Sequence, residues 1–121
     1  MAAEYFVKRV YEPYHKNDGY RILVDRLWPR GLTKEHAHVD LWLKEIAPSD
    51  ALRKWFAHDP AKWNGFLKKY KEEIEQNPVK EELLELTNEH KRITFLYSTK
   101  EENYNNATAL LQWLQHGTKK A

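Results

Sequence analysis

The sequence of 121 residues contains no cysteine, and this absence removes several classes of chemistry. Disulfides, thiolate metal sites and cysteine nucleophiles are excluded, and with them thiol phosphatases and sulfur transferases. Glycine is scarce as well, because the 4 glycines stand singly and form none of the glycine-rich loops that hold phosphates or dinucleotides. No serine lies in the sequence context of a nucleophile elbow.

Long hydrophobic runs are also missing. No aliphatic run exceeds the three residues of 22–24, and the first ten residues alternate apolar and basic positions instead of forming an export signal. We therefore expect no membrane segment and a cytoplasmic location. Hydrophobic residues make up 41% of the chain and aromatic residues 13%, which is enough apolar mass for one folded domain. We expect this domain to span residues 1–117 and to end in a frayed tail at 118–121.

Hydrophobic periodicity predicts strands that alternate with helices. Strands are expected at 5–11, 20–25, 39–46 and 92–97, a short helical turn from Thr33, and helices from about 48, over 61–76, from 79 to about 89, and over roughly 102–116. The connection between the first two strands is too short for a crossover helix, so these strands should be antiparallel or loosely paired. Trp42, Trp55, Trp63 and Trp113 should lie in the core. The fold class predicted is α/β, with a small mixed, partly parallel sheet flanked by helices.

Polar side chains follow two of the predicted strands. Asp25, Arg26 and Arg30 come after the second strand, around the stiff Trp28-Pro29 pair. Arginine forms two-pronged contacts with phosphate or carboxylate, and two arginines exceed what one aspartate can neutralise. Ligands of open α/β sheets gather at the carboxyl ends of the strands, so this segment is a candidate anion-binding site. Asp25 could orient an arginine or act as a general base.

The last predicted strand also ends in polar residues, Tyr97-Ser98-Thr99-Lys100. Ser98 and Thr99 each have a glutamate three residues later, which is the capping-box spacing of a helix start that presents free N–H groups to anions. Lys100 would add positive charge there. If the two strands are parallel neighbours, both polar segments face one cleft. The Tyr97 hydroxyl would then meet a core partner or line the cleft.

Structural alternatives accompany these functional interpretations. Asp25 with Arg26 or Arg53 could be a buried ion pair that only stabilises the fold. His58 follows a predicted helix, where it could be a cation favoured by the helix dipole or a proton carrier at the cleft. The 6 histidines show no metal-ligand spacing, so no metal site is predicted, and nothing points to a cofactor or to a particular oligomeric state.

A larger pattern joins these segments. The strings DGYRILVDRLWPRG, LRKWFAHD, FLYSTK and NNA occur in this order, with APS before the second. The chain resembles the YeaO-like family of small uncharacterised bacterial proteins over about residues 7–114. The resemblance implies an α/β fold and a bacterial cytoplasmic protein, but no established activity. The family pattern can be carried onto a set of polar positions: Asp25, Arg26, Arg30, Lys34, Lys44, Ser49, Arg53, His58, Tyr97, Lys100 and Asn106.

Three functions remain open from the sequence. The first is a binder of, or enzyme for, a small phosphate-bearing ligand such as a nucleotide, with Asp25 and His58 as proton-transfer residues. Its ligand-binding set would be Arg26, Arg30, Lys34, Arg53, Tyr97, Lys100 and Asn106. The second is a nucleic-acid-binding module that uses Arg9, Arg21, Arg30 and Lys34 on backbone phosphates. The third is a structural or interaction protein with an internal Arg-Asp network.

Overall fold

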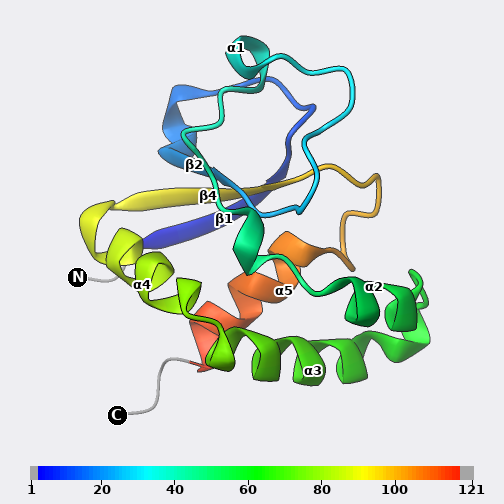
Figure 1. The fold of residues 1–121 in the computed structure, drawn as a ribbon. Helices are drawn as coiled ribbons and strands as arrows, with labels where there is room; N and C mark the ends of the chain where they lie inside the picture. The colour runs from blue at the N-terminus through cyan, green and yellow to red at the C-terminus, as the bar shows by residue number, and fades with distance from the viewer. Residues whose placement is uncertain (1–2, 118–121) are drawn as a thin grey trace.

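The computed structural model describes residues 3–117. Within these residues the centre of the protein is a four-stranded sheet in the order β1-β4-β2-β3 (Figure 1). Its strands are β1 (Glu4–Arg9), β2 (Tyr20–Leu23), β3 (Leu41–Trp42) and β4 (Arg92–Tyr97). All three strand pairings are parallel. The expected α/β class is confirmed, and the sheet is parallel rather than mixed.

Both faces of the sheet are covered, because successive side chains of the central strand β4 belong to hydrophobic cores on opposite faces. Ile93 and Phe95 of β4 belong to the larger hydrophobic core, whereas Leu96 belongs to a smaller core on the opposite face. Ile22 and Leu23 of β2 divide in the same way. Successive side chains of a strand point to opposite faces, so continuous apolar runs form strands that are buried on both sides.

Helices cover one face of the sheet, and irregular chain covers the other (Figure 1). The helical layer contains α2 (Asp50–Phe56), α3 (Trp63–Gln76), α4 (Val79–Glu89) and α5 (Asn106–Gln112), followed by a π-helical turn at Trp113–Gly117. The opposite layer contains the 10–19 and 24–40 segments with the short helix α1 (Lys34–Ala37). The start of α1 is as expected, because the Thr33 hydroxyl accepts a hydrogen bond from the His36 N–H.

β1 and β2 are not paired with each other, because each flanks β4. The 10–19 segment between them crosses to the far side of β4, and the Thr94 hydroxyl donates to the Asp18 carbonyl at 2.7 Å. Gly19 makes this close approach possible: its φ is +71°, and a Cβ placed there would lie 2.3 Å from the Arg92 carbonyl oxygen. A connection too short for a helix therefore passes over β4 and joins its two parallel neighbours.

Some expected element boundaries are wrong. The third strand covers only Leu41–Trp42, because the chain turns at Leu43 into a 3-10 turn at Lys44–Ile46. The last helix begins at Asn106, not near residue 102, because Asn105 is its cap.

Trp55 is 38% exposed, so its expected place in the core is also wrong. The tail expected at 118–121 lies outside the described residues.

Candidate functional site

A cavity of about 620 Å³ lies at the carboxyl ends of β1, β2 and β4. Its lining comes from four segments that are far apart in the sequence: Arg9 and Tyr11; residues 25–30; Arg53, Lys54, Phe56, His58 and Phe66; and Ser98, Thr99, Tyr104, Asn105 and Asn106. β2 and β4 are parallel neighbours, with Leu23 beside Leu96, so the polar segments that follow them meet in one cleft. The sequence predicted this meeting from the two polar strand ends.

Asp25 joins the end of β2 to the segment after β4. Its Oδ2 accepts hydrogen bonds from the Ser98 N–H and the Ser98 hydroxyl, both at 2.8 Å, and its Oδ1 accepts one from the Asn106 side-chain amide at 3.1 Å. Burial raises the pKa of Asp25 above its ordinary value, although these hydrogen bonds and the nearby charge of Arg53 act in the opposite direction. Asp25 forms no ion pair within residues 3–117. The structural alternative, an ion pair of Asp25 with Arg26 or Arg53, is therefore absent.

Arg26 is half-buried and has few partners. Its Nη2 donates to the carbonyls of Ala47 and Pro48 at 3.3 and 3.4 Å, which are long contacts. Its Nε is buried and has no hydrogen-bond partner in the described part of the chain. A guanidinium has five N–H donors and is always charged, so Arg26 keeps donors and a positive charge that no carboxylate of the described residues neutralises.

Other basic groups surround the same cavity. Arg30 is exposed, and among the described residues its guanidinium has no hydrogen-bond or ion-pair partner. Arg53 forms an exposed ion pair with Asp50 at 3.2 Å, and an exposed pair of this kind neutralises the charge of Arg53 only in part. The lining contains five lysines and arginines (Arg9, Arg26, Arg30, Arg53 and Lys54) and a single acidic residue, Asp25. Excess positive charge at a concave surface concentrates anions there.

Arg9 is a cavity residue that the sequence-based site set did not include. Its Nε donates to the carbonyls of Ser98 and Thr99 at 3.1 and 3.0 Å, and its guanidinium carbon lies 4.6 Å from the ring centre of Tyr11. The Tyr11 hydroxyl in turn donates to the Arg30 carbonyl at 2.7 Å. These bonds tie the strand ends of β1, β2 and β4 together. The sequence did contain a signal for Arg9, because it lies near the end of the first predicted strand. Since β1 is parallel to β4, the ends of both strands lie at the same edge of the sheet.

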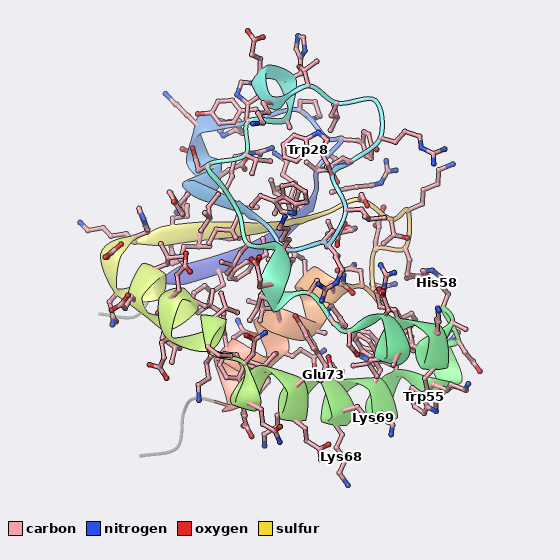
Figure 2. All side chains as sticks on the ribbon, in the orientation of Figure 1. Trp28, Trp55, His58, Lys68, Lys69 and Glu73 are labelled. Atoms are coloured by element: carbon pink, nitrogen blue, oxygen red, sulfur yellow. The ribbon has the colours of Figure 1, made fainter. Side chains whose placement is uncertain are left out.

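Two tryptophans stabilise the 25–30 segment from the side away from the helices. The Trp28 indole donates to the Leu32 carbonyl, and the Trp42 indole donates to the Asp25 carbonyl, both at 2.7 Å. The two rings meet edge to face with centroids 5.5 Å apart. Figure 2 shows Trp28 on the opposite side of the sheet from α3. This packing fixes the backbone that carries Asp25 and Arg26, as the stiff Trp28-Pro29 pair suggested.

His58 lies at the cavity, just past the end of α2 (Figure 2). It and Ala57 have positive φ values of 58° and 48°, so the chain turns sharply there. The His58 ring is exposed and lies 6.4 Å from the Phe56 ring, and no described residue hydrogen-bonds to it. Phe56 itself is buried and forms part of the cavity wall with Phe66.

The structure brings together most of the predicted site residues but not all of them. Asp25, Arg26, Arg30, Arg53, His58 and Asn106 line the cavity, whereas Lys34, Tyr97 and Lys100 do not. Lys34 lies on α1 and is exposed, Tyr97 is 4% exposed at the end of β4, and Lys100 is exposed in the following loop. Lys54, Tyr104 and Asn105 are cavity residues that the sequence analysis missed.

Two other expectations about polar residues are wrong. Ser98 and Thr99 do not start a helix; the Ser98 hydroxyl bonds Asp25, and α5 starts after Asn105. The nucleic-acid alternative placed Arg21 on backbone phosphates, but Arg21 is 1% exposed, pairs with Asp18 and donates to the carbonyls of Ala37 and His38. Arg21 therefore has a structural role beneath the 10–19 segment.

Residues 3–117 contain no group of three or more His, Asp or Glu residues placed to hold a metal ion. None of their helices has the length and apolar character needed to cross a membrane.

Comparisons with known proteins give a consistent result. The model of a family described as the inactive DUF488-N3 subclade matches residues 5–121. The uncharacterized protein YeaO of Escherichia coli is 43% identical over 108 residues, which cover 89% of this chain and 94% of that protein. Uncharacterized proteins of Mycobacterium bovis and Mycobacterium tuberculosis are 43% identical over 81 residues, 67% of this chain and 69% of theirs. No solved structure matches.

Proposed function

We propose that this chain, which belongs to the inactive DUF488-N3 subclade and is a YeaO-like bacterial protein, binds a small phosphate-bearing ligand, of nucleotide size, in the cavity at the strand ends. The ligand's phosphate would lie against Arg26 and Arg30. The remainder of the ligand would lie against the aromatic wall.

The state of Arg26 is the observation that carries this proposal. A half-buried guanidinium normally pairs with a carboxylate or satisfies its donors on carbonyls, because an unpaired buried donor costs about 1 to 3 kcal/mol. Arg26 has only two long carbonyl contacts and a buried Nε without a partner. A bound phosphate would accept from Nη1, which has no partner among the described residues and, unlike Nε, is not buried, and would neutralise the guanidinium charge.

The size and walls of the cavity favour a ligand larger than inorganic phosphate. A volume of about 620 Å³ is in the usual range for sites of small organic ligands. Phe56, Phe66 and Tyr104 line it together with the arginines, so one cavity offers both charged and aromatic contacts. A nucleotide has this same combination of phosphate and flat ring.

Binding is favoured here over catalysis. The description of the subclade as inactive is in line with a protein that retains a site and lacks turnover. His58 has no described partner to orient its ring, as a general base would need. Asp25 is the better placed of the two, because hydrogen bonds from Ser98 and Asn106 fix the orientation of its carboxyl at the cavity. Catalysis by Asp25 is therefore the second candidate.

Calorimetric titration of the protein with inorganic phosphate, a nucleoside and the corresponding nucleoside monophosphate tests the proposal. We expect the nucleotide to bind more tightly than phosphate, and the nucleoside to bind weakly. The Arg26→Met variant should lose about 1.5 to 3 kcal/mol of binding free energy, the range for charge-assisted hydrogen bonds. Lys100→Met is the charge-matched control, since Lys100 lies outside the cavity lining and should bind as the unmodified protein does.

Two results would overturn the proposal. One is the absence of any heat of binding for phosphate and nucleotide at low ionic strength, where charge attraction is strongest. The other is equal loss of affinity in Arg26→Met and Lys100→Met, which would indicate only a general effect of net charge.

A further inference from the structure

β1 lies at one edge of the sheet and uses only half of its backbone hydrogen-bonding groups. The Glu4 N–H donates to the Lys91 carbonyl, and the Val10 N–H donates to the Tyr97 carbonyl. Even-numbered residues of β1 therefore direct their peptide groups toward β4, and those of Tyr5 and Val7 point away from the sheet. Within the described chain, no hydrogen bond satisfies these outward groups.

Soluble proteins usually protect such an edge with free charges, proline or a bulge. The six residues of β1 contain no proline, and their register with β4 is continuous. The charged side chains of β1 are engaged elsewhere in the same chain. Lys8 bonds Asp18 and the Pro13 carbonyl, and Arg9 bonds the carbonyls of the segment after β4. Free cations that would repel an approaching strand are therefore missing from this edge.

Phe6 occupies the middle of the unprotected edge and is 43% exposed. It lies on the face opposite to Tyr5 and Val7, whose side chains pack against the larger core. The Arg92 guanidinium carbon lies 5.3 Å from the Phe6 ring centre, so the ring is covered only in part. An apolar, β-favouring sequence with outward peptide groups is suited to pairing with another strand.

We propose that β1 pairs antiparallel with β1 of a second copy of this chain, with Phe6 opposite Phe6 of that copy at the two-fold axis. The axis then makes Tyr5 and Val7 opposite partners, and both have outward N–H and carbonyl groups without a partner in the described chain. Each such pair exchanges both backbone hydrogen bonds. The four-stranded sheets of the two copies would become one continuous sheet.

Charge and hydrogen bonding favour this register and a second copy as the partner. Glu4 of each chain faces Lys8 of the other, and no like charges meet across the axis; within its own chain Glu4 is paired with Arg92 and Lys8 with Asp18. A register with Val7 on the axis would place Tyr5 opposite Arg9, whose carbonyl already accepts a bond from the Glu12 N–H at 3.0 Å. In the Phe6-centred register the two central hydrogen-bonded pairs, both between Tyr5 and Val7, use only backbone groups that are free, and the occupied Arg9 carbonyl lies at the end of the ladder.

Sedimentation velocity over a range of protein concentrations tests the association. The unmodified chain should show a reversible monomer-dimer equilibrium. Phe6→Lys would place two ammonium groups opposite each other, and it should weaken the dimer about tenfold or more. Leu27→Lys is the matched control, because Leu27 is a more exposed apolar residue, at 70%, away from β1. A chain that stays monomeric at all concentrations, or equal effects of both variants, would overturn the proposal.

Disulfide cross-linking tests the register, since the chain has no cysteine of its own. Directly opposite positions of a non-hydrogen-bonded pair have Cβ atoms about 4.5 to 5.5 Å apart, close enough for a disulfide after a small adjustment. Phe6→Cys should therefore form a covalent dimer in a glutathione buffer. Val7→Cys should not, because the two Val7 positions are diagonal in this register. Efficient cross-linking of Val7→Cys with none in Phe6→Cys would contradict the register.

Discussion

Asp25 shows how a single carboxyl can organise a basic cavity without neutralising it. Three donors, two from Ser98 and one from Asn106, hold its oxygens, so it links the end of β2 to the start of α5. Because these partners are uncharged, Asp25 forms no ion pair with Arg26, whose guanidinium has no carboxylate partner among the described residues. An ion pair between Asp25 and Arg26 would have neutralised the guanidinium and removed the anion site.

The raised pKa of Asp25 has a consequence for the free energy of unfolding. The folded state holds the proton more tightly than the unfolded state does, so stability from this group is greatest at low pH. It is lost as pH rises from the unfolded pKa, about 3.9, through the higher folded pKa. The stability of the unmodified protein relative to Asp25→Asn should therefore decrease across this window. Urea unfolding of both proteins at a series of pH values measures the difference.

Ser98→Ala is the matched variant for the Asp25 measurement. It removes the hydroxyl donor at 2.8 Å and leaves the carboxyl in place, so the pKa of Asp25 should rise further. The pH-dependent part of the stability difference should then extend to higher pH. A difference between Asp25→Asn and the unmodified protein that does not change with pH would contradict the argument.

The start of α5 shows how a correct local pattern can predict the wrong boundary. Ser98 and Thr99 have the spacing of a capping box, but the Ser98 hydroxyl donates a hydrogen bond to Asp25 and does not cap a helix. The chain continues as a loop until Asn105, whose Oδ1 accepts from the Thr108 N–H at 2.9 Å. The Asn105 amide also donates to the Glu101 carbonyl, which fixes the loop that carries Tyr104 into the cavity.

Substitution of the two possible caps separates these alternatives. Asn105→Ala should reduce the free energy of unfolding by about 1 kcal/mol or more, because it removes the true cap of α5 and leaves the Glu101 carbonyl without its donor. Thr99→Ala should change it by less than about 0.5 kcal/mol, since its hydroxyl accepts only one long bond, at 3.3 Å. Chemical denaturation measures the free energy of unfolding of both variants and shows which residue caps α5. A larger effect for Thr99→Ala would contradict the observed helix start.

The elements that sequence predicted well are those whose pattern agrees with their surroundings. β4 is buried on both faces along most of its length, and its apolar run indicated this directly. The 39–46 segment alternates like a strand, yet only Leu41–Trp42 pairs with β2. There, the Trp42 indole binds the Asp25 carbonyl, and Leu43 turns the chain toward α2. Periodicity contains no information about such tertiary contacts, so the strand length was overestimated.

At the scale of the whole molecule, the location of the cavity followed from topology. Two polar segments after two apolar strands suffice to predict a cleft, provided that the strands are parallel neighbours. The sequence did not predict which lysine and arginine side chains line the cleft. Lys34 and Lys100 are close in sequence to the site but lie outside its lining, whereas Arg9 reaches it through the pairing of β1 with β4. Long-range pairing, absent from any local pattern, decides these positions.

Ligand binding at this cavity should also stabilise the whole fold, because the lining comes from four separate segments that come together only in the folded chain. A ligand that binds only the folded state adds about 2.7 kcal/mol to the free energy of unfolding when its concentration is a hundred times Kd. Urea unfolding with and without nucleoside monophosphate, at equal ionic strength set with sodium chloride, measures this gain. We expect the gain to shrink at high salt and to be much smaller in Arg26→Met at the same ligand concentration. Equal stabilisation by chloride alone would show that screening of the basic cluster, not a bound phosphate, accounts for the effect.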